Sequence, residues 1–304
     1  MARRIIECVP NFSEGRNPET VARIADAVTS VPGVALIGKE SDPDHNRSVL
    51  TIAGPPEAVS EAAFRAVQVA VQCIDLRCHQ GVHPRLGAAD VVPFVPILNT
   101  TLEECAAYAH TFGRRVWNEL QVPVYFYESA ALSEDRRRLE NVRRGGFEKV
   151  CELVRQTPER RPDLGGPDLH PSAGAVIAGA RKFLLAFNVN LDTEDVAIAR
   201  AIAVKIRASS GGLPHVKAMG VLLASRNLAQ VSMNLTDFEV TPLHVVFEAV
   251  EREAALRGVR IAGSEVIGLM PATALAMAAA HALRIENFHS RQILENRLLS
   301  NLID

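Results

Sequence analysis

Apolar and polar positions alternate along this chain in short runs with the period of strands and longer runs with the period of helices. Pro18 lies in the first turn of one predicted helix, and Thr101 precedes two glutamates at the start of another, as helix starts favour. In the first half we predict strands at residues 4–9, 34–37, 48–53, 91–97 and 124–127, and helices at residues 17–28, 55–74 and 101–120.

The residue composition changes between residues 132 and 171, where charged residues are followed by many prolines, glycines and aspartates. We expect the charged run at residues 134–144 to form the solvated face of a surface helix, followed by an irregular connection. The opening pattern then returns. Strands are predicted at residues 182–189, 216–222, 229–235 and 265–268, and helices at residues 193–207, 242–256 and 271–283.

Both halves therefore have the order β-α-β-β-α-β. The first strand of each half ends with an asparagine, Asn11 or Asn188, close to the helix that follows. We predict an α/β (α+β) protein of two ferredoxin-like subdomains, residues 1–178 and 179–304. Two such sheets facing each other would leave a cleft, and ligands favour domain interfaces.

Composition and charge argue against several classes of protein but do not identify a function. The 304 residues carry a formal net charge of -2, so no global positive field indicates nucleic acid. No apolar run approaches the roughly 18–20 residues of a membrane span, and the basic N-terminus lacks the apolar core of a signal peptide. The five cysteines form no Cys-x-x-Cys pair. We expect a cytoplasmic protein that binds neither nucleic acid nor membrane.

The segment at residues 78–87 is the most informative stretch of chemistry. It places His79, His83 and Arg85 in a loop between a predicted helix and a predicted strand, where binding and catalytic groups concentrate. Histidine moves protons near neutral pH, and arginine binds anions in bidentate fashion. A proton-transfer site and a plain polar surface loop both remain open on these residues.

A metal site is the third interpretation of the same loop. His79 and His83 are four residues apart, which on a helix would place both on one face as a zinc pair. Gly81 lies between them, however, and Pro84 pushes the residue before it out of the helical region. The helical pair is therefore disfavoured, and we expect no metal.

Three further loops carry polar side chains near strand ends. Residues 11–16 and 42–47 are turn-forming segments that also offer carboxylates, amides and arginines, and together with the histidine loop they could converge in space. Residues 165–174 form a linker or a loop that closes over a ligand. Residues 174–181 match the phosphate-loop spacing only weakly, because the Lys-Ser/Thr ending is missing, and the chain has no dinucleotide-binding fingerprint.

Taken together, these segments resemble the glutamate formiminotransferase family, the N-terminal part of formiminotransferase-cyclodeaminase. The resemblance extends over nearly the whole chain. It is carried by residues 7–15, Asn46-Arg47, residues 54–56, His83-Pro84-Arg85-Leu86-Gly87-Ala88 with Asp90, Pro93-Phe94, residues 179–184, 186–188, 190–191, 227–232 and 237–240, and Gly268-Leu269.

The resemblance implies transfer of a formimino group from N-formimino-L-glutamate to tetrahydrofolate as co-substrate, late in histidine degradation. It implies a folate tunnel between the two subdomains, a homodimer, and His83 as the catalytic histidine. Because the chain ends at Asp304, we expect a separate cyclodeaminase to act on the product. The implied substrate- and folate-binding residues are Asn11, Glu40, Asp44, Asn46, Arg47, Arg85, Gly165, Gly166, Pro167, Asp168, Leu169, His170, Pro171, Ser172, Ala173, Gly174 and Asn188.

Two positions depart from the family pattern. Glu40 stands where the family has aspartate, and Ala173 stands where an aromatic residue is common before the last glycine of the folate segment.

The alternatives are a related enzyme acting on 5-formyltetrahydrofolate or N-formylglutamate, a folate-binding subunit without turnover, and, least favoured, a hydrolytic metalloenzyme. In the mechanism that the resemblance implies, neutral His83 takes a proton from N5 of tetrahydrofolate and returns it to the departing glutamate nitrogen.

Overall fold

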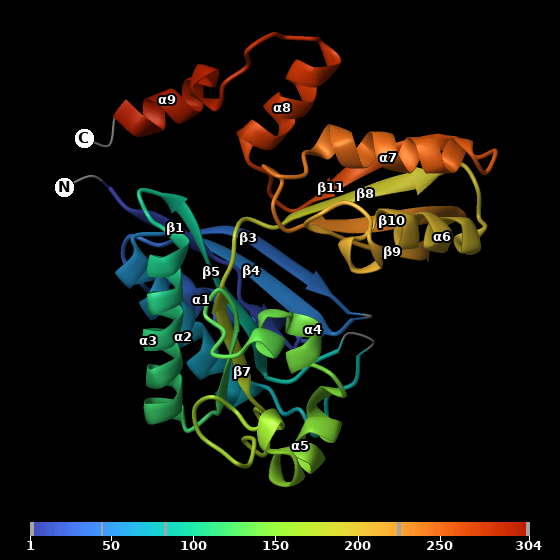
Figure 1. Ribbon diagram of the computed structural model, residues 1–304. Helices are drawn as coiled ribbons and strands as arrows, with labels where there is room; N and C mark the ends of the chain where they lie inside the picture. The colour runs from blue at the N-terminus through green and yellow to red at the C-terminus, as the bar shows by residue number, and fades with distance from the viewer. Residues whose placement is uncertain (1–2, 44, 82–83, 224–225, 302–304) are drawn as a thin grey trace. The chain divides into compact units, whose positions relative to one another are not determined.

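The computed structural model describes residues 3–43, 45–81, 84–223 and 226–301 (Figure 1). The chain divides into two compact units, Met1–Arg181 and Lys182–Asp304, and each has a sheet and a hydrophobic core of its own. The division falls after Arg181 rather than after residue 178, because residues on both sides of 178 belong to one strand of the first sheet.

The first unit is built on a seven-stranded sheet. Its spatial order is β3, β4, the collinear pair β1 and β2, then β5, β7 and β6; β5, β7 and β6 run parallel and the other pairs antiparallel. The strands are β1 (Ile5–Cys8), β2 (Asn11–Phe12), β3 (Ala35–Asp42), β4 (Arg47–Gly54), β5 (Ala89–Leu98), β6 (Val124–Glu128) and β7 (Val176–Ala180).

Strands β1 and β2 are one line of chain interrupted at Pro10. Cys8 pairs with Ile52 of β4, and Asn11 pairs with Val49, so the register is unchanged across the gap. Pro10 has no N–H to donate, but its carbonyl still accepts from the amide of Leu50 at 3.1 Å. The interruption therefore leaves the strand direction intact, and Asn11 is held at a fixed place on the sheet.

Helices of the first unit pack their apolar faces into one core. Figure 1 shows α1, α2 and α3 grouped beside the sheet, and α4 and α5 apart from them. Asn17 caps α1 by accepting from two backbone amides, and Thr101 and Glu104 form a capping box on α3. The helices are α1 (Pro18–Thr29), α2 (Pro56–Cys73), α3 (Leu102–Leu120), α4 (Leu139–Val142) and α5 (Gly146–Gln156), with 3₁₀ turns at Glu134–Arg137 and Pro158–Arg160.

The second unit contains a four-stranded antiparallel sheet in the order β11, β8, β10, β9. Alternate residues of its strands join α6 and α7 in a second core. The elements are β8 (Leu185–Leu191), α6 (Val196–Ile206), β9 (Val216–Leu223), β10 (Leu228–Leu235), α7 (Leu243–Ala255), β11 (Ile261–Ile267), α8 (Ala272–Ala282) and α9 (Leu294–Asn301), with 3₁₀ turns at Ala208–Ser210 and Ser290–Gln292.

The two sheets share one strand order. In the first unit β5, β1–β2, β4 and β3 lie side by side, and in the second β11, β8, β10 and β9 do. In each case the neighbours are the fourth, first, third and second strands of a β-α-β-β-α-β run. The predicted α+β architecture of two related units is therefore confirmed, and the first unit adds β6 and β7 at one edge.

Three parts of the sequence prediction differ from the structure. Residues 174–179, where no strand was predicted, contain most of β7, which is buried along its whole length. The charged run at residues 134–144 is not all solvated, because Arg136 pairs with Asp163 and Arg143 with Asp90, all four side chains being largely buried. The helix α9 was not predicted. Within the described residues, no helix is long and apolar enough to cross a membrane.

Candidate functional site

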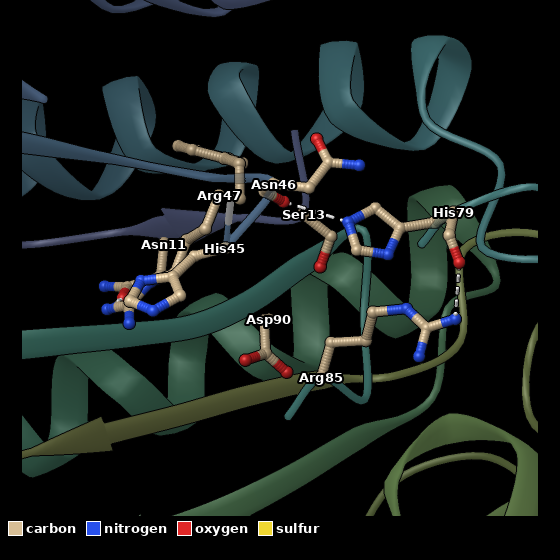
Figure 2. A pocket seen from close by; sticks show the side chains of 9 residues that line it. Asn11, Ser13, His45, Asn46, Arg47, His79, Arg85 and Asp90 are labelled. Carbon is tan, nitrogen blue, oxygen red and sulfur yellow. Dashed lines mark hydrogen bonds between the residues drawn. The ribbon is translucent and has the colours of Figure 1, made fainter. Parts of the chain in front are cut away.

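The strand ends of the first unit enclose a small polar pocket (Figure 2). Its interior is about 10 Å³, room for roughly one water molecule. It is lined by Asn11, Phe12, Ser13, His45, Asn46, Arg47, His79, Arg85 and Asp90. The loop after β1–β2, the turn between β3 and β4, and the histidine loop all contribute, so the three loops that the sequence singled out do converge.

Arg47 lies at the base of the pocket at the start of β4. Its Nη2 donates to Oδ1 of Asn11, and Nδ2 of Asn11 donates to the carbonyl of Val9 at 2.8 Å. Asn11 is buried, so both ends of its amide are satisfied by this arrangement. The pair links the first strand to the β3–β4 turn and fixes the guanidinium beside the pocket.

The surroundings of Arg47 in the pocket disfavour its positive charge. Burial first, and then the positive charge of Arg143, lower the pKa of Arg47 to about 10. The carboxylates of Asp90, Asp42 and Glu40 oppose this lowering. Burial and a neighbouring guanidinium both disfavour the charge of Arg47, so an added anion would stabilise it, and this end of the pocket is suited to a carboxylate.

Asn46 joins the three loops. Its backbone is left-handed, with φ 49°, a region that asparagine tolerates. Its Oδ1 accepts from the amide of Gly15 at 3.0 Å, and its Nδ2 donates to the carbonyl of Gln80 at 3.0 Å. Nε2 of His79 bonds the carbonyl of Asn46 at 2.9 Å, which requires this ring nitrogen to carry the proton. His79 therefore anchors the histidine loop to the β3–β4 turn.

Glycine is needed where these loops meet. A Cβ on Gly15 would lie 2.3 Å from the carbonyl oxygen of Asp42, and a Cβ on Gly81 would lie 2.3 Å from that of His45. Both obstacles are backbone atoms and cannot rotate away. The absence of side chains at these two positions lets the loops pack close enough to form the pocket.

Arg85 is surrounded by acceptors from the protein itself. Its Nη2 donates to the carbonyls of Leu76 and His79 at 3.2 and 3.1 Å, and to Oε1 of Glu148 at 2.7 Å. Its Nη1 reaches Oε2 of Glu148 at 3.3 Å. The hydrogen bond from Arg85 lowers the pKa of Glu148. Arg85 thus fixes the histidine loop against α5, and a substrate carboxylate would have to displace Glu148 to reach it.

Asp90 fixes the other end of the same loop. Its Oδ1 accepts from the amides of Leu86 and Gly87 at 2.7 and 3.3 Å, and Nη2 of Arg143 contacts its Oδ2 at 2.5 Å. The carboxylate is almost fully buried, so its pairing with Arg143 is required rather than incidental. Arg143 and Glu148 were not predicted from the sequence, and they lie 53 and 63 residues from their partners.

The segment at residues 165–174 lies in the first unit and packs against the histidine loop at one end. Ser172 accepts from the amide of Leu76 at 2.8 Å, and Ala173 accepts from that of Ala88 at 2.9 Å. Nδ1 of His170 accepts from the amides of Ala173 and Ser172 at 3.0 and 3.4 Å, and burial lowers the pKa of this imidazole. The neutral ring thus closes a tight turn.

Members of this segment have different exposures. The side chains of Leu169 and Ala173 are buried in the core, whereas Asp168 is exposed and pairs with Arg155. Gly165 and Gly166 have positive φ, a Cβ on Gly165 would contact the Trp117 ring, and the Gly166–Pro167 bond is cis. Pro171 lies in the turn that His170 closes, and Gly174 forms a bridge with Gly87.

The remaining predicted positions are dispersed. Glu40 is exposed on β3, in register with Val49 and within electrostatic reach of Arg47. Asn188 lies in the second unit on β8, buried and bonded to Glu265. Asp44 and His83 lie outside the described residues. Among the described residues, no group of three or more histidine, cysteine or carboxylate side chains could hold a metal.

Comparison with known proteins shows one family across the chain. Residues 5–181 match the formiminotransferase domain, N-terminal subdomain, and residues 186–302 match the formiminotransferase domain. The chain is 46% identical over 297 residues to the glutamate formimidoyltransferase of Streptococcus pyogenes, covering 97% of this chain and 99% of that protein. It is 44% identical over 296 residues to the glutamate formimidoyltransferase of Thermoplasma acidophilum, covering 97% of each.

A longer relative gives the same result. The chain is 45% identical over 308 residues to the formimidoyltransferase-cyclodeaminase of Sus scrofa, covering 97% of this chain and 56% of that protein. The family matches occupy most of both units, and the first two relatives are aligned almost end to end. The chain therefore belongs to the formiminotransferase family.

Proposed function

We propose that this protein is a glutamate formimidoyltransferase, which transfers the formimino group of N-formimino-L-glutamate to N5 of tetrahydrofolate. The products are 5-formiminotetrahydrofolate and L-glutamate, and the reaction belongs to histidine degradation. The observation that carries the proposal is the end-to-end similarity to two proteins of that name. The cation-rich pocket at the strand ends of the first unit supports it, because the donor is a dicarboxylate.

The pocket supplies the binding chemistry. Arg47, with its charge disfavoured by burial and by Arg143, is the group we assign to a substrate carboxylate. Asn11 holds that guanidinium in place. Arg85 already has Glu148 and two carbonyls as acceptors, so we assign it to positioning the histidine loop. Because the pocket has room for about one water, substrate binding would require the surrounding loops to open.

The reaction needs one proton to move twice. N5 of tetrahydrofolate attacks the formimino carbon, a new C–N bond forms, and N5 loses its proton. The bond between that carbon and the glutamate nitrogen then breaks, and the departing nitrogen gains a proton. A neutral imidazole can serve as base in the first step and as acid in the second, and we assign this role to His83.

Replacing His83 with alanine tests the assignment. We expect kcat to fall by about 10²–10⁴-fold, the usual contribution of a general acid–base, while both substrates still bind. Turnover and substrate affinity are measured separately, by product formation and by calorimetry. His215→Ala, at an exposed histidine of the second unit, serves as the matched control. Near-normal turnover of the His83 variant would remove this residue from the mechanism.

The donor is identified by direct comparison. N-formimino-L-glutamate, N-formyl-L-glutamate and 5-formyltetrahydrofolate are offered to the same preparation, and transfer is followed by mass spectrometry of the folate product. We expect the formimino donor to be used with the highest kcat/KM. A formyl donor that reacts faster would move the protein to a related folate activity, and tight folate binding without transfer would favour a non-catalytic subunit.

The finer features of the proposal follow from the family. We propose that residues 165–174 contribute to folate binding through their exposed members, since Leu169 and Ala173 have buried side chains. The shared strand order supports a ferredoxin-like description of both units. A cytoplasmic homodimer whose product passes to a cyclodeaminase completes the proposal. The name of the pig relative joins the two activities in one protein.

A further inference from the structure

A buried polar cluster lies on the sheet of the second unit, away from α6 and α7. In β8 and β10, alternate residues enter the core, and the positions between them include Asn188, Asn190 and Gln230. These three residues are 7%, 3% and 3% exposed. Amides at such positions are costly to bury unless they are hydrogen-bonded, and an apolar sheet face would need none of them. Because burying these amides is costly, we expect the cluster to have a role beyond packing.

The hydrogen bonds of the cluster converge on one carboxylate, that of Glu265 on β11. Nε2 of Gln230 donates to Oε1 of Glu265 at 2.6 Å and to Oδ1 of Asn190 at 2.7 Å. Nδ2 of Asn188 approaches the same Oε1 at 3.4 Å, and Oδ1 of Asn188 accepts from the amide of Met233 at 3.3 Å. The amides thus form a platform that fixes the orientation of Glu265.

Glu265 is the accessible member of the cluster. Its side chain is 36% exposed, and its second oxygen lies 3.9 Å from Nη1 of Arg226, too far for a normal hydrogen bond. Oε1 is held by the amides, whereas among the described residues Oε2 has only the distant guanidinium of Arg226 beside it and can accept from a further donor. A carboxylate presented in this way is suited to a ligand edge that carries two N–H groups.

The cluster occupies positions that correspond to the pocket of the first unit. Asn11 pairs with Val49 of the third strand there, and Asn188 pairs with Ser232 of the third strand here. Two residues before Val49 the third strand carries Arg47, and two residues before Ser232 it carries Gln230, which pairs with Asn190. The first site is cationic, whereas the second presents amides and one carboxylate. Their ligands should therefore differ in charge.

We propose that Glu265, oriented by Gln230 and Asn188, binds the 2-amino-4-oxopyrimidine edge of the folate pterin. This inference rests on the proposed function, and it names the residue that recognises the acceptor ring. The N3–H and the 2-amino group of the pterin lie side by side, so both can donate to Oε2 of Glu265, while Oε1 stays bonded to the amides. The glutamate parts of both substrates are anionic and would be repelled by Glu265, so the pterin is the complementary portion.

Glu265→Gln tests the proposal with little risk to the fold, because the side chains are nearly isosteric and the site is partly exposed. The probe is a tetrahydropterin without the aminobenzoylglutamate tail, which binds only through the ring. We expect its Kd to rise about ten- to a hundredfold, as loss of charge-assisted hydrogen bonds predicts. The Kd for N-formimino-L-glutamate should not change. Glu251→Gln, at an exposed glutamate of α7, is the matched control.

A ligand analogue separates recognition from general damage. In wild type, replacing the 2-amino group of the tetrahydropterin with methyl should weaken binding about as much as Glu265→Gln does, and the two changes together should cost little more than either alone. Additive losses, or equal weakening of both substrates with a lower Tm, would overturn the proposal and leave Glu265 a structural residue. If wild type transfers the formimino group while the variant binds the tetrahydropterin normally, only this inference fails.

Discussion

At the scale of single residues, the site depends on how charged side chains are paired. Arg47 and Arg85 line the same pocket but differ in their partners. Arg47 has a neighbouring cation and a pKa lowered to about 10, so an anion would relieve it. Arg85 is already held by the Glu148 carboxylate and by two carbonyls. These two arginines of one loop cluster therefore differ in their surroundings, and the different roles that we propose for them rest on that difference.

Glu148→Gln distinguishes the two roles that Arg85 can have. If Arg85 positions the histidine loop, weakening its ion pair should lower kcat about two- to fivefold and leave KM nearly unchanged, because Glu148 is well exposed and such pairs contribute modestly. If Arg85 instead binds a substrate carboxylate, removing the competing Glu148 charge should lower KM. Steady-state kinetics with N-formimino-L-glutamate measures both constants. Glu152→Gln, on the same helix and paired with Lys149, is the control.

At the scale of elements, the turn closed by His170 is sensitive to pH. Its Nδ1 accepts two backbone amides, which requires a neutral ring, and burial lowers its pKa below the ordinary value of 6.5. The unfolded segment therefore binds more protons than the folded one as pH falls below about 6.5. The turn's stability is complete above that pH, and we expect it to be lost progressively as the pH decreases toward the folded pKa.

Hydrogen exchange measures this loss locally. Protection factors of the amides of Ala173 and Ala88, which depend on the turn, should decrease between neutral pH and pH 5 once intrinsic exchange is corrected. His170→Asn keeps a side-chain acceptor for the turn but does not titrate, so its protection should be independent of pH. Equal pH dependence in both proteins would show that another group controls the segment.

Elements with a clear periodic or apolar pattern were predictable, including the buried strands β5 and β6, whereas the short strand β7 was missed. The alternating strands β4, β8 and β10 follow from period-two patterns, and α1 and α3 from their caps. Strand β7 has five buried residues, Val-Ile-Ala-Gly-Ala, and thus no alternation to detect. Gly174 before the run and Gly179 within it weaken the strand pattern further, and no strand was predicted there.

The residues of the site also fall into two groups, those that the sequence indicated and those that it did not. Loops rich in asparagine, histidine and arginine at strand ends indicated Asn11, Asn46 and Arg47, and these do line one pocket. Arg143 and Glu148 carry no local signal, since their function comes from partners more than fifty residues away. The same charged residue types occur on a solvated helix face and at positions that support a site, so residue type alone does not separate the two. The contacts of the folded chain are needed to tell them apart.

At the scale of the whole molecule, the chain repeats one β-α-β-β-α-β design with two separate cores. Leu50 of β4 and Leu191 of β8 are both fully buried strand residues, one in each core. Replacing either with alanine should reduce the stability of its own unit by about 2–5 kcal/mol. Because the cores share no residues, we expect the loss to be confined to the unit that carries the change.

Hydrogen exchange followed by mass spectrometry measures the amide protection of the two units separately. Leu50→Ala should accelerate exchange in peptides before Arg181 and leave β8 and β10 protected, and Leu191→Ala should do the reverse. Each variant is then the control for the other, since the chemistry and the burial of the two substitutions are alike. Loss of protection throughout the chain in both variants would mean that the two units unfold as one cooperative body. The repeated design would then have two cores but a single folding transition.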